Sequence, residues 1–180
     1  MRSAWRLIAA LGFFLLSAAG LAADELVAVP PLKTRVTDLT GTLSRDQAAA
    51  LEADLAQFEK SRGSQIAILL VPTTQPEPIE AYSIRVAEAW KLGRKGIDDG
   101  ILVLVARNDR KLRIEVGRGL EGALPDVVAK RIIEETMLPR FRSGDYFGGL
   151  QDGVSQTKAI IASEPLPSPR RNMQGAAAAG

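Results

Sequence analysis

The sequence predicts an α/β domain in which helices cover both faces of a small mixed β-sheet. Two runs, 65–71 and 101–106, are apolar without alternation, which is typical of central strands covered on both sides. A helical pattern separates them, and a right-handed crossover should make them parallel neighbours. A third run, 112–116, follows a short polar turn at 107–110 and predicts an antiparallel hairpin. The predicted architecture is a three-layer α/β/α sandwich whose sheet combines a parallel pair with an antiparallel hairpin.

The first 23 residues have the parts of a secretory signal. Arg2 and Arg6 give a basic start, an apolar run covers 7–19, and small residues lead to an expected cleavage near Ala22. Because the run is short for a membrane span, we expect export to the periplasm. An uncleaved signal that holds the protein at the membrane stays open as the alternative.

The rest of the chain divides by composition into a lead-in, one domain and a tail. Residues 24–35 contain Pro30-Pro31 and predict an extended lead-in. The domain covers 36–164, which is long enough to bury a core. From Pro165 the chain is rich in proline, arginine and alanine, and we expect 165–180 to be disordered because it has little apolar surface to bury.

Four helices are predicted from apolar spacing together with start and stop residues. In the first, Gln47 lies three residues after Ser44 and completes a capping box. Glycine is a common helix stop and proline suits a first helical turn. The first helix is expected between Ser44 and Gly63, the second between Ile79 and Gly93, and the third between Pro125 and Pro139. The fourth follows its N-cap, Asp145.

The composition excludes several kinds of chemistry. The 180 residues include no histidine and no cysteine, which removes Ser-His-Asp and Cys-His catalysis and the usual zinc ligands. Oxygen ligands remain, and these suit calcium, magnesium or manganese. Removing the signal also removes two arginines and no acid, so the mature chain carries equal numbers of basic and acidic residues. We therefore expect no nucleic-acid partner.

Acidic residues flank both outer ends of the predicted hairpin. Asp98 and Asp99 precede its first strand, and Glu121 and Asp126 follow its second. Antiparallel pairing brings these ends together, so the four carboxylates should crowd one rim of the sheet. They would repel one another unless a cation neutralised them, which favours a divalent metal site.

Each of these acids also has an ordinary structural interpretation. Asp98-Asp99-Gly100 can form a turn, and Asp126 can complement a helix dipole. Glu121 can be a solvated surface residue, and Asp38 can form an Asx-turn. Both interpretations stay open on the sequence alone.

Basic residues accompany the acidic ends. Arg94 and Arg118 lie close to them in sequence and could hold an anion such as phosphate. Arg107 and Arg110 belong to the hairpin turn at its other end, where we expect solvated surface. Glycines 117, 119 and 122 do not have the spacing of a dinucleotide-binding loop, and a P-loop lysine is missing.

Four stretches together resemble the TPM domain family, also known as TPM phosphatase. They are VTDLTGTLS, QIAILLVPTT, DDGILVLVARNDRKLRIEVGRGLEGALPD and LPRFRSGDYFGGLQDGV, in this order between Val36 and Ile161. The resemblance implies an exported or lumenal domain like those of thylakoid lumen and bacterial envelope proteins. It also implies a bound divalent cation, foremost calcium, with magnesium or manganese as alternatives.

The family's acidic pattern falls on particular residues of this sequence. Asp38, Asp99, Glu121 and Asp126 match it, and Asp98 is an additional candidate ligand. For Asp145 and Tyr146, which also match, helix capping and core packing are sufficient explanations.

The resemblance implies two alternative functions. One is a metal-dependent acid phosphatase that hydrolyses a phosphorylated small molecule; its catalytic residues are unassigned, and a carboxylate of raised pKa would have to act as acid. The other is a non-catalytic calcium-binding module that binds membrane protein complexes during assembly, repair or quality control.

Overall fold

The computed structural model describes residues 25–163. The predicted signal, 1–23, and the predicted tail, 165–180, therefore lie outside the described residues. The elements in chain order are β1 (Val36–Asp38), α1 (Arg45–Arg62), β2 (Gln65–Val71), α2 (Ile79–Trp90), β3 (Gly100–Ala106), β4 (Lys111–Val116), the 3-10 helix η1 (Arg118–Leu120), α3 (Asp126–Arg131), the π-helical η2 (Ile132–Met137), α4 (Leu138–Arg142) and α5 (Tyr146–Ala162).

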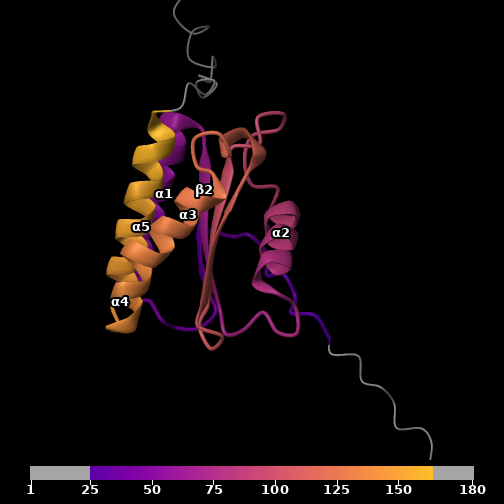
Figure 1. Cartoon of the computed structure of the whole chain (residues 1–180), viewed down its shortest axis with the longest axis vertical. Helices are drawn as coiled ribbons and strands as arrows, with labels where there is room; N and C mark the ends of the chain where they lie inside the picture. The colour runs from indigo at the N-terminus through magenta and orange to yellow at the C-terminus, as the bar shows by residue number, and fades with distance from the viewer. Residues whose placement is uncertain (1–24, 164–180) are drawn as a thin grey trace, which may run out of the picture.

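The described strands form one sheet in the order β1-β2-β3-β4. Strands β1, β2 and β3 run parallel, and β4 pairs antiparallel with β3 at the edge. Helices α1, α3, α4 and α5 cover one face, whereas α2 covers the other (Figure 1). This arrangement confirms the predicted α/β/α sandwich, with its parallel pair and its antiparallel hairpin.

The sheet separates two apolar cores. Alternate residues of β2 and β3 point to opposite faces: Ile68 and Val103 belong to the core under α1 and α5, while Leu69 and Leu104 belong to the core under α2. Both strands are buried on both sides, which explains their continuous apolar sequence. In β4 only one face is apolar, because the other face carries Arg113 and Glu115 toward Ser83 of α2.

The predicted helix caps are present. The Ser44 hydroxyl accepts the Gln47 amide N–H, and the Gln47 side chain accepts the Ser44 amide N–H, which completes the capping box of α1. The Asp145 carboxylate accepts the Gly148 amide N–H at the start of α5. Gly63 closes α1 in the left-handed conformation, at a φ of 87°.

The structure corrects the prediction that the third helix stops by Pro139. Helical structure continues there, because α3 passes through the π-helical η2 directly into α4. Pro139 is the second residue of α4 and follows the π-helical η2, an irregular turn of the kind at which a helix accommodates a proline. Glycines in α5 allow this segment to pack closely: a Cβ on Gly153 would lie 2.6 Å from the buried Met137 side chain.

The segment before β1 packs against α2. The Tyr82 hydroxyl donates to the Ala28 carbonyl at 3.1 Å, and the Trp90 indole N–H donates to the Pro30 carbonyl at 2.7 Å. Val27 and Val29 cover the same core. Tyr82 and Trp90 are thus core residues.

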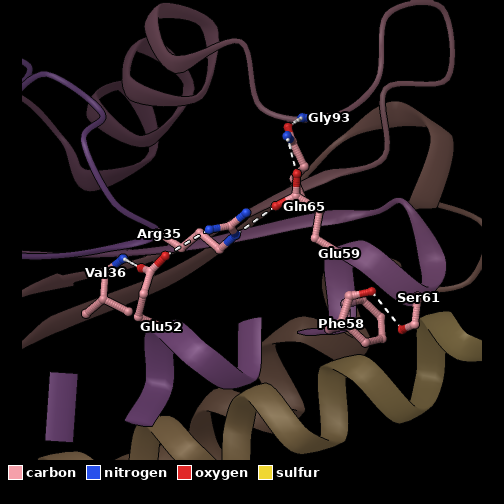
Figure 2. A network of polar contacts seen from close by, with 8 residues as sticks. All are labelled: Arg35, Val36, Glu52, Phe58, Glu59, Ser61, Gln65 and Gly93. Carbon is pink, nitrogen blue, oxygen red and sulfur yellow. Dashed lines mark hydrogen bonds and ion pairs between the residues drawn. The ribbon is translucent and has the colours of Figure 1, made fainter. Parts of the chain in front are cut away.

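A polar network ties β1 and α1 to the loop that precedes β3 (Figure 2). Arg35 forms ion pairs of 2.8 Å with both Glu52 and Glu59 of α1. Glu59 also accepts from Nε2 of the Gln65 side chain at 2.9 Å, and Oε1 of the same side chain accepts the Gly93 N–H at 2.8 Å. The network therefore fixes the start of the loop that carries the acidic residues.

Between residues 25 and 163, no helix has both the length and the hydrophobicity needed to cross a membrane.

Candidate functional site

The open end of the β3–β4 hairpin carries the acidic rim, which we define as Asp98, Asp99, Glu121 and Asp126. Strand pairing sets Ile101 opposite Val116, and the Gly117 N–H continues the ladder to the Gly100 carbonyl at 2.8 Å. One step further, the Gly119 N–H donates to the Asp98 carbonyl at 3.0 Å. The two outer ends of the hairpin thus lie against each other, as antiparallel pairing predicts.

The close contact between these ends depends on two glycines. A Cβ on Gly117 would lie 2.2 Å from the Asp98 carbonyl oxygen, and one on Gly119 would lie 1.8 Å from the Ile97 carbonyl oxygen. A Cβ on Gly122 would meet nothing within 4 Å. Two of the three glycines therefore serve the packing of backbone against backbone.

Asp99 is fully buried, with 0% of its side chain exposed, and its carboxylate is surrounded by donors. One oxygen accepts the Arg94 backbone N–H at 2.7 Å. The other accepts Arg94 Nε at 2.8 Å and Nη2 at 2.6 Å, and the Ser64 hydroxyl at 3.3 Å. In this arrangement Asp99 organises the loop 94–99, and the Arg94 guanidinium donates to the Asp99 carboxylate.

Asp98 and Glu121 face the same surface cavity, of about 350 Å³, together with Arg118. Arg118 Nε lies 4.0 Å from an Asp98 oxygen, and both side chains are largely exposed. An ion pair of this length and exposure contributes little to stability. These two carboxylates are therefore the members of the rim that a ligand from solvent could reach with least rearrangement.

Asp126 lies at the start of α3, also close to Glu121, with which it lines a second cavity of about 350 Å³. Its carboxylate is 2.9 Å from Lys130 Nζ and 3.8 Å from Arg113 Nη1. The hydrogen bond from Lys130 lowers the pKa of Asp126 below its usual value. Asp126 therefore stays ionised in mild acid.

Asp38 lies apart from the rim. It ends β1 and pairs in register with Leu70, which in turn pairs with Val105 near the far end of β3. Asp99, by contrast, precedes the first residue of β3. The Asp38 carboxylate accepts the Thr40 N–H and hydroxyl at 2.8 and 2.6 Å and the Leu43 N–H at 2.8 Å. Asp38 therefore forms an Asx-turn, the ordinary structural role that the sequence left open for it.

The rim does not form a ready-made cation site. Within residues 25–163, no group of three or more acidic side chains is close enough to hold a metal ion. The predicted ligands are instead bonded separately, Asp99 to Arg94, Asp126 to Lys130 and Asp38 to its own loop. The donor set in this arrangement does not fit a tightly bound resident metal, which needs several carboxylates directed at one point.

Sequence reasoning missed Ser64 and Gln65, which support the loop 94–99 from the start of β2. A weak signal was available. An acid directly before a strand that is apolar on both faces is carried into the interior, where a buried carboxylate needs a cationic partner such as Arg94.

The geometry so far defines a small α/β/α domain with an acidic rim whose carboxylates are mostly engaged in internal contacts. The sequence model of the TPM domain, labelled TPM phosphatase, matches residues 36–160, and the chain belongs to this family. The resemblance found in the sequence is thus confirmed. No functionally curated protein matches the chain.

Solved structures with the same fold come from several bacteria. The N-terminal domain of a P. gingivalis protein is 33% identical, with a TM-score of 0.67, over 74% of this chain and 88% of that one. BA42 from the psychrophilic Bizionia argentinensis is 19% identical, with a TM-score of 0.60, over 69% and 84%. The N-terminal domain of cg2496 from Corynebacterium glutamicum is 15% identical, with a TM-score of 0.54, over 82% and 96%.

Proposed function

We propose that this TPM domain is a non-catalytic binding module of the cell envelope rather than a phosphatase. The observation that carries the proposal is the state of Asp99. This carboxylate is central to the predicted metal site, yet it is buried and accepts four hydrogen bonds from Arg94 and Ser64. Freeing it for catalysis would break these four hydrogen bonds and disrupt the loop.

The rim also lacks the groups that hydrolysis of a phosphate ester requires. A phosphatase without histidine needs a clustered metal site or a carboxylic acid of raised pKa. Within the described residues no acidic cluster suits a metal, and the pKa of Asp126 is lowered rather than raised. Binding requires neither of these features.

The rim offers a mixed surface that suits a protein partner. Ile84 of α2 is 46% exposed and lines the cavity that Asp98, Arg118 and Glu121 share. Exposed charges around an apolar residue are typical of the edge of a protein interface. We propose a membrane protein complex as the partner, and export to the periplasm, with or without an uncleaved signal, on the strength of residues 1–23.

A divalent cation at the rim would be held by Asp98 and Glu121. These two carboxylates share a cavity, and between them only Asp98 has a cationic contact, the long one to Arg118. Two carboxylates and water give weak affinity, so calcium, magnesium or manganese would be exchangeable.

A phosphatase assay tests the proposal. The full chain is assayed from acidic to neutral pH with calcium, magnesium, manganese or a chelator, alongside Asp98→Asn/Glu121→Gln. The matched control is Glu134→Gln/Glu135→Gln, which removes the same charge from an exposed part of η2. We expect no metal-dependent turnover in any of the three proteins. Turnover that disappears in the rim variant and persists in the control would overturn the proposal.

Binding can be detected directly by photo-crosslinking in the envelope. A crosslinking side chain at Ile84 should give a discrete adduct with an envelope protein, since Ile84 is exposed at the rim. The same group at Glu135 serves as control because it lies on the opposite side of the sheet. Identical adduct patterns at the two positions would contradict a partner surface at the rim.

A further inference from the structure

A second hollow lies at the hairpin turn, between the end of β3 and the α4–α5 corner. It has a volume of about 550 Å³, within the usual range for small-molecule sites. We call it the basic groove and define it by its polar and aromatic lining: Arg107, Arg110, Lys111, Phe141, Arg142 and Tyr146. Val105, Ala106, Leu112 and Leu138 complete its apolar wall.

The groove and the acidic rim occupy opposite ends of the sheet. Arg107 and Arg110 follow the carboxyl end of β3, whereas Asp99 directly precedes its amino end. Residues of α4 and of the start of α5 line one side of the groove. Its chemistry is therefore independent of the function proposed for the rim.

Among the residues that the structure describes, four cationic side chains line the groove and no carboxylate does. Within residues 25–163, Arg107, Arg110, Lys111 and Arg142 have no ion pair with an acid. Like charges held around one hollow repel one another, and an anion relieves that repulsion.

The acids nearest in sequence are committed elsewhere. Asp109, inside the hairpin turn, accepts the Thr73 hydroxyl at 2.7 Å and the Thr74 N–H at 2.9 Å. Asp145, next to Tyr146, caps α5 and forms an ion pair of 2.8 Å with Arg140. Neither carboxylate lines the groove, so the positive charge is not neutralised from within the fold.

An aromatic pair forms part of the wall. The rings of Phe141 and Tyr146 are 4.7 Å apart between centroids, and the Arg107 guanidinium lies 5.6 Å from the Tyr146 centroid. A cation–π contact of this kind helps to orient Arg107. The groove thus presents oriented positive charge beside an apolar, aromatic surface.

We propose that the basic groove binds a phosphate ester, with the phosphate held by the arginines and the organic part against Phe141 and Tyr146. A phosphomonoester carries close to two negative charges at neutral pH, and guanidinium groups bind its oxygens in forked geometry. Outside residues 25–163 the sequence has only two acidic side chains, Asp24 and Glu164, against four arginines, so it adds no excess of negative charge. The ester can be a soluble metabolite or a lipid headgroup, because both present the same phosphate.

The groove is built for binding and not for turnover. Among its lining residues only Tyr146 carries a hydroxyl, and none is a carboxylate that could act as general acid or metal ligand. The expected role is recognition of the phosphate ester without hydrolysis. A failed phosphatase assay and a failed binding test would therefore be separate results.

Calorimetric titration of the full chain with phenyl phosphate tests the groove. We expect phenyl phosphate to bind at least about tenfold more tightly than inorganic phosphate or benzoate, because only it combines a double charge with a ring. Arg107→Gln/Arg142→Gln should weaken binding about tenfold or more. Tyr146→Leu should weaken phenyl phosphate more than inorganic phosphate.

The matched control is Lys60→Gln/Arg131→Gln, which removes the same charge from exposed positions that do not line the groove; Lys60 lies in the last turn of α1, which leads to the start of β2. It should change affinity less than about twofold, the small change expected for distant screened charges. Equal losses in both double variants would mean general surface charge and would overturn the proposal. So would equal affinity for phenyl phosphate and inorganic phosphate.

Vesicle sedimentation identifies the source of the phosphate. Retention on vesicles that contain phosphatidic acid, whose headgroup is a phosphomonoester, but not on phosphatidylcholine vesicles, would indicate a lipid headgroup if phenyl phosphate competes it away. Binding of phenyl phosphate without vesicle retention would indicate a soluble ester. Vesicle retention that neither phenyl phosphate nor the groove variant reduces would count against the groove.

Discussion

Asp99→Asn should lower the free energy of unfolding by about 3 kcal/mol, the scale expected when one partner of a buried ion pair is removed. Asparagine has nearly the same volume, so the loss would come from charge and hydrogen bonding rather than from a cavity. Arg94, 22% exposed, would keep its charge and lose the ion pair with Asp99. Urea unfolding measures the change. Asp98→Asn is the matched control, and because Asp98 is exposed it should change stability by less than about 0.5 kcal/mol.

The same measurement separates a structural Asp99 from a metal ligand. If Asp99 organises the loop through Arg94, the loss should be equal in calcium and in chelator. If Asp99 instead held a cation, calcium would stabilise the wild type but not the variant, because a ligand stabilises only the protein that binds it. The two free energies of unfolding would then differ mainly in calcium. A loss confined to calcium would contradict the structural role and revive the metal site.

The elements that could be predicted are those whose signals are local or strongly periodic. The capping box at Ser44 involves residues three apart, and the apolar runs of β2 and β3 need no knowledge of their neighbours. The strand β1 was not predicted because its three residues are too few to show a pattern. The continuation of helical structure past Pro139 was not predicted either, because it depends on how η2 packs against α5.

The candidate site was predictable only in its approximate position. Strand pairing alone brings the residues around Asp98 and Glu121 together, and this follows from the hairpin. Whether a carboxylate faces solvent or an arginine is decided by side-chain packing, which is why the burial of Asp99 could not be foreseen. The separation of Asp38 from the rim depends on β1, which the sequence did not reveal.

The basic groove was even less predictable from the sequence than the acidic rim. The sequence assigns Arg107 and Arg110 to solvated surface at a hairpin turn. Their importance arises only when Arg142 and Tyr146, from a distant part of the chain, are placed beside them. No local pattern links two such segments, so the grouping required tertiary structure.

Gly119→Ala should destabilise the domain by about 2–4 kcal/mol, from steric conflict together with a lost hydrogen bond. The new Cβ would lie 1.8 Å from the Ile97 carbonyl oxygen, which is backbone and cannot rotate away. Relieving the clash requires the loop to move, which breaks the bond of 3.0 Å from the Gly119 N–H to the Asp98 carbonyl. Thermal and urea unfolding measure the loss.

Gly122→Ala is the control for this prediction, because it adds the same methyl group to the same loop with nothing within 4 Å. Its effect should stay within about 0.5 kcal/mol. Equal stability of the two variants would show that the contact between the hairpin ends is not tight. The expected large difference would mean that backbone packing at Gly119, rather than a bound cation, holds the two ends of the rim together. Asp98 and Glu121 would then have their positions before any ligand arrives, and a cation or partner would bind an arrangement that already exists.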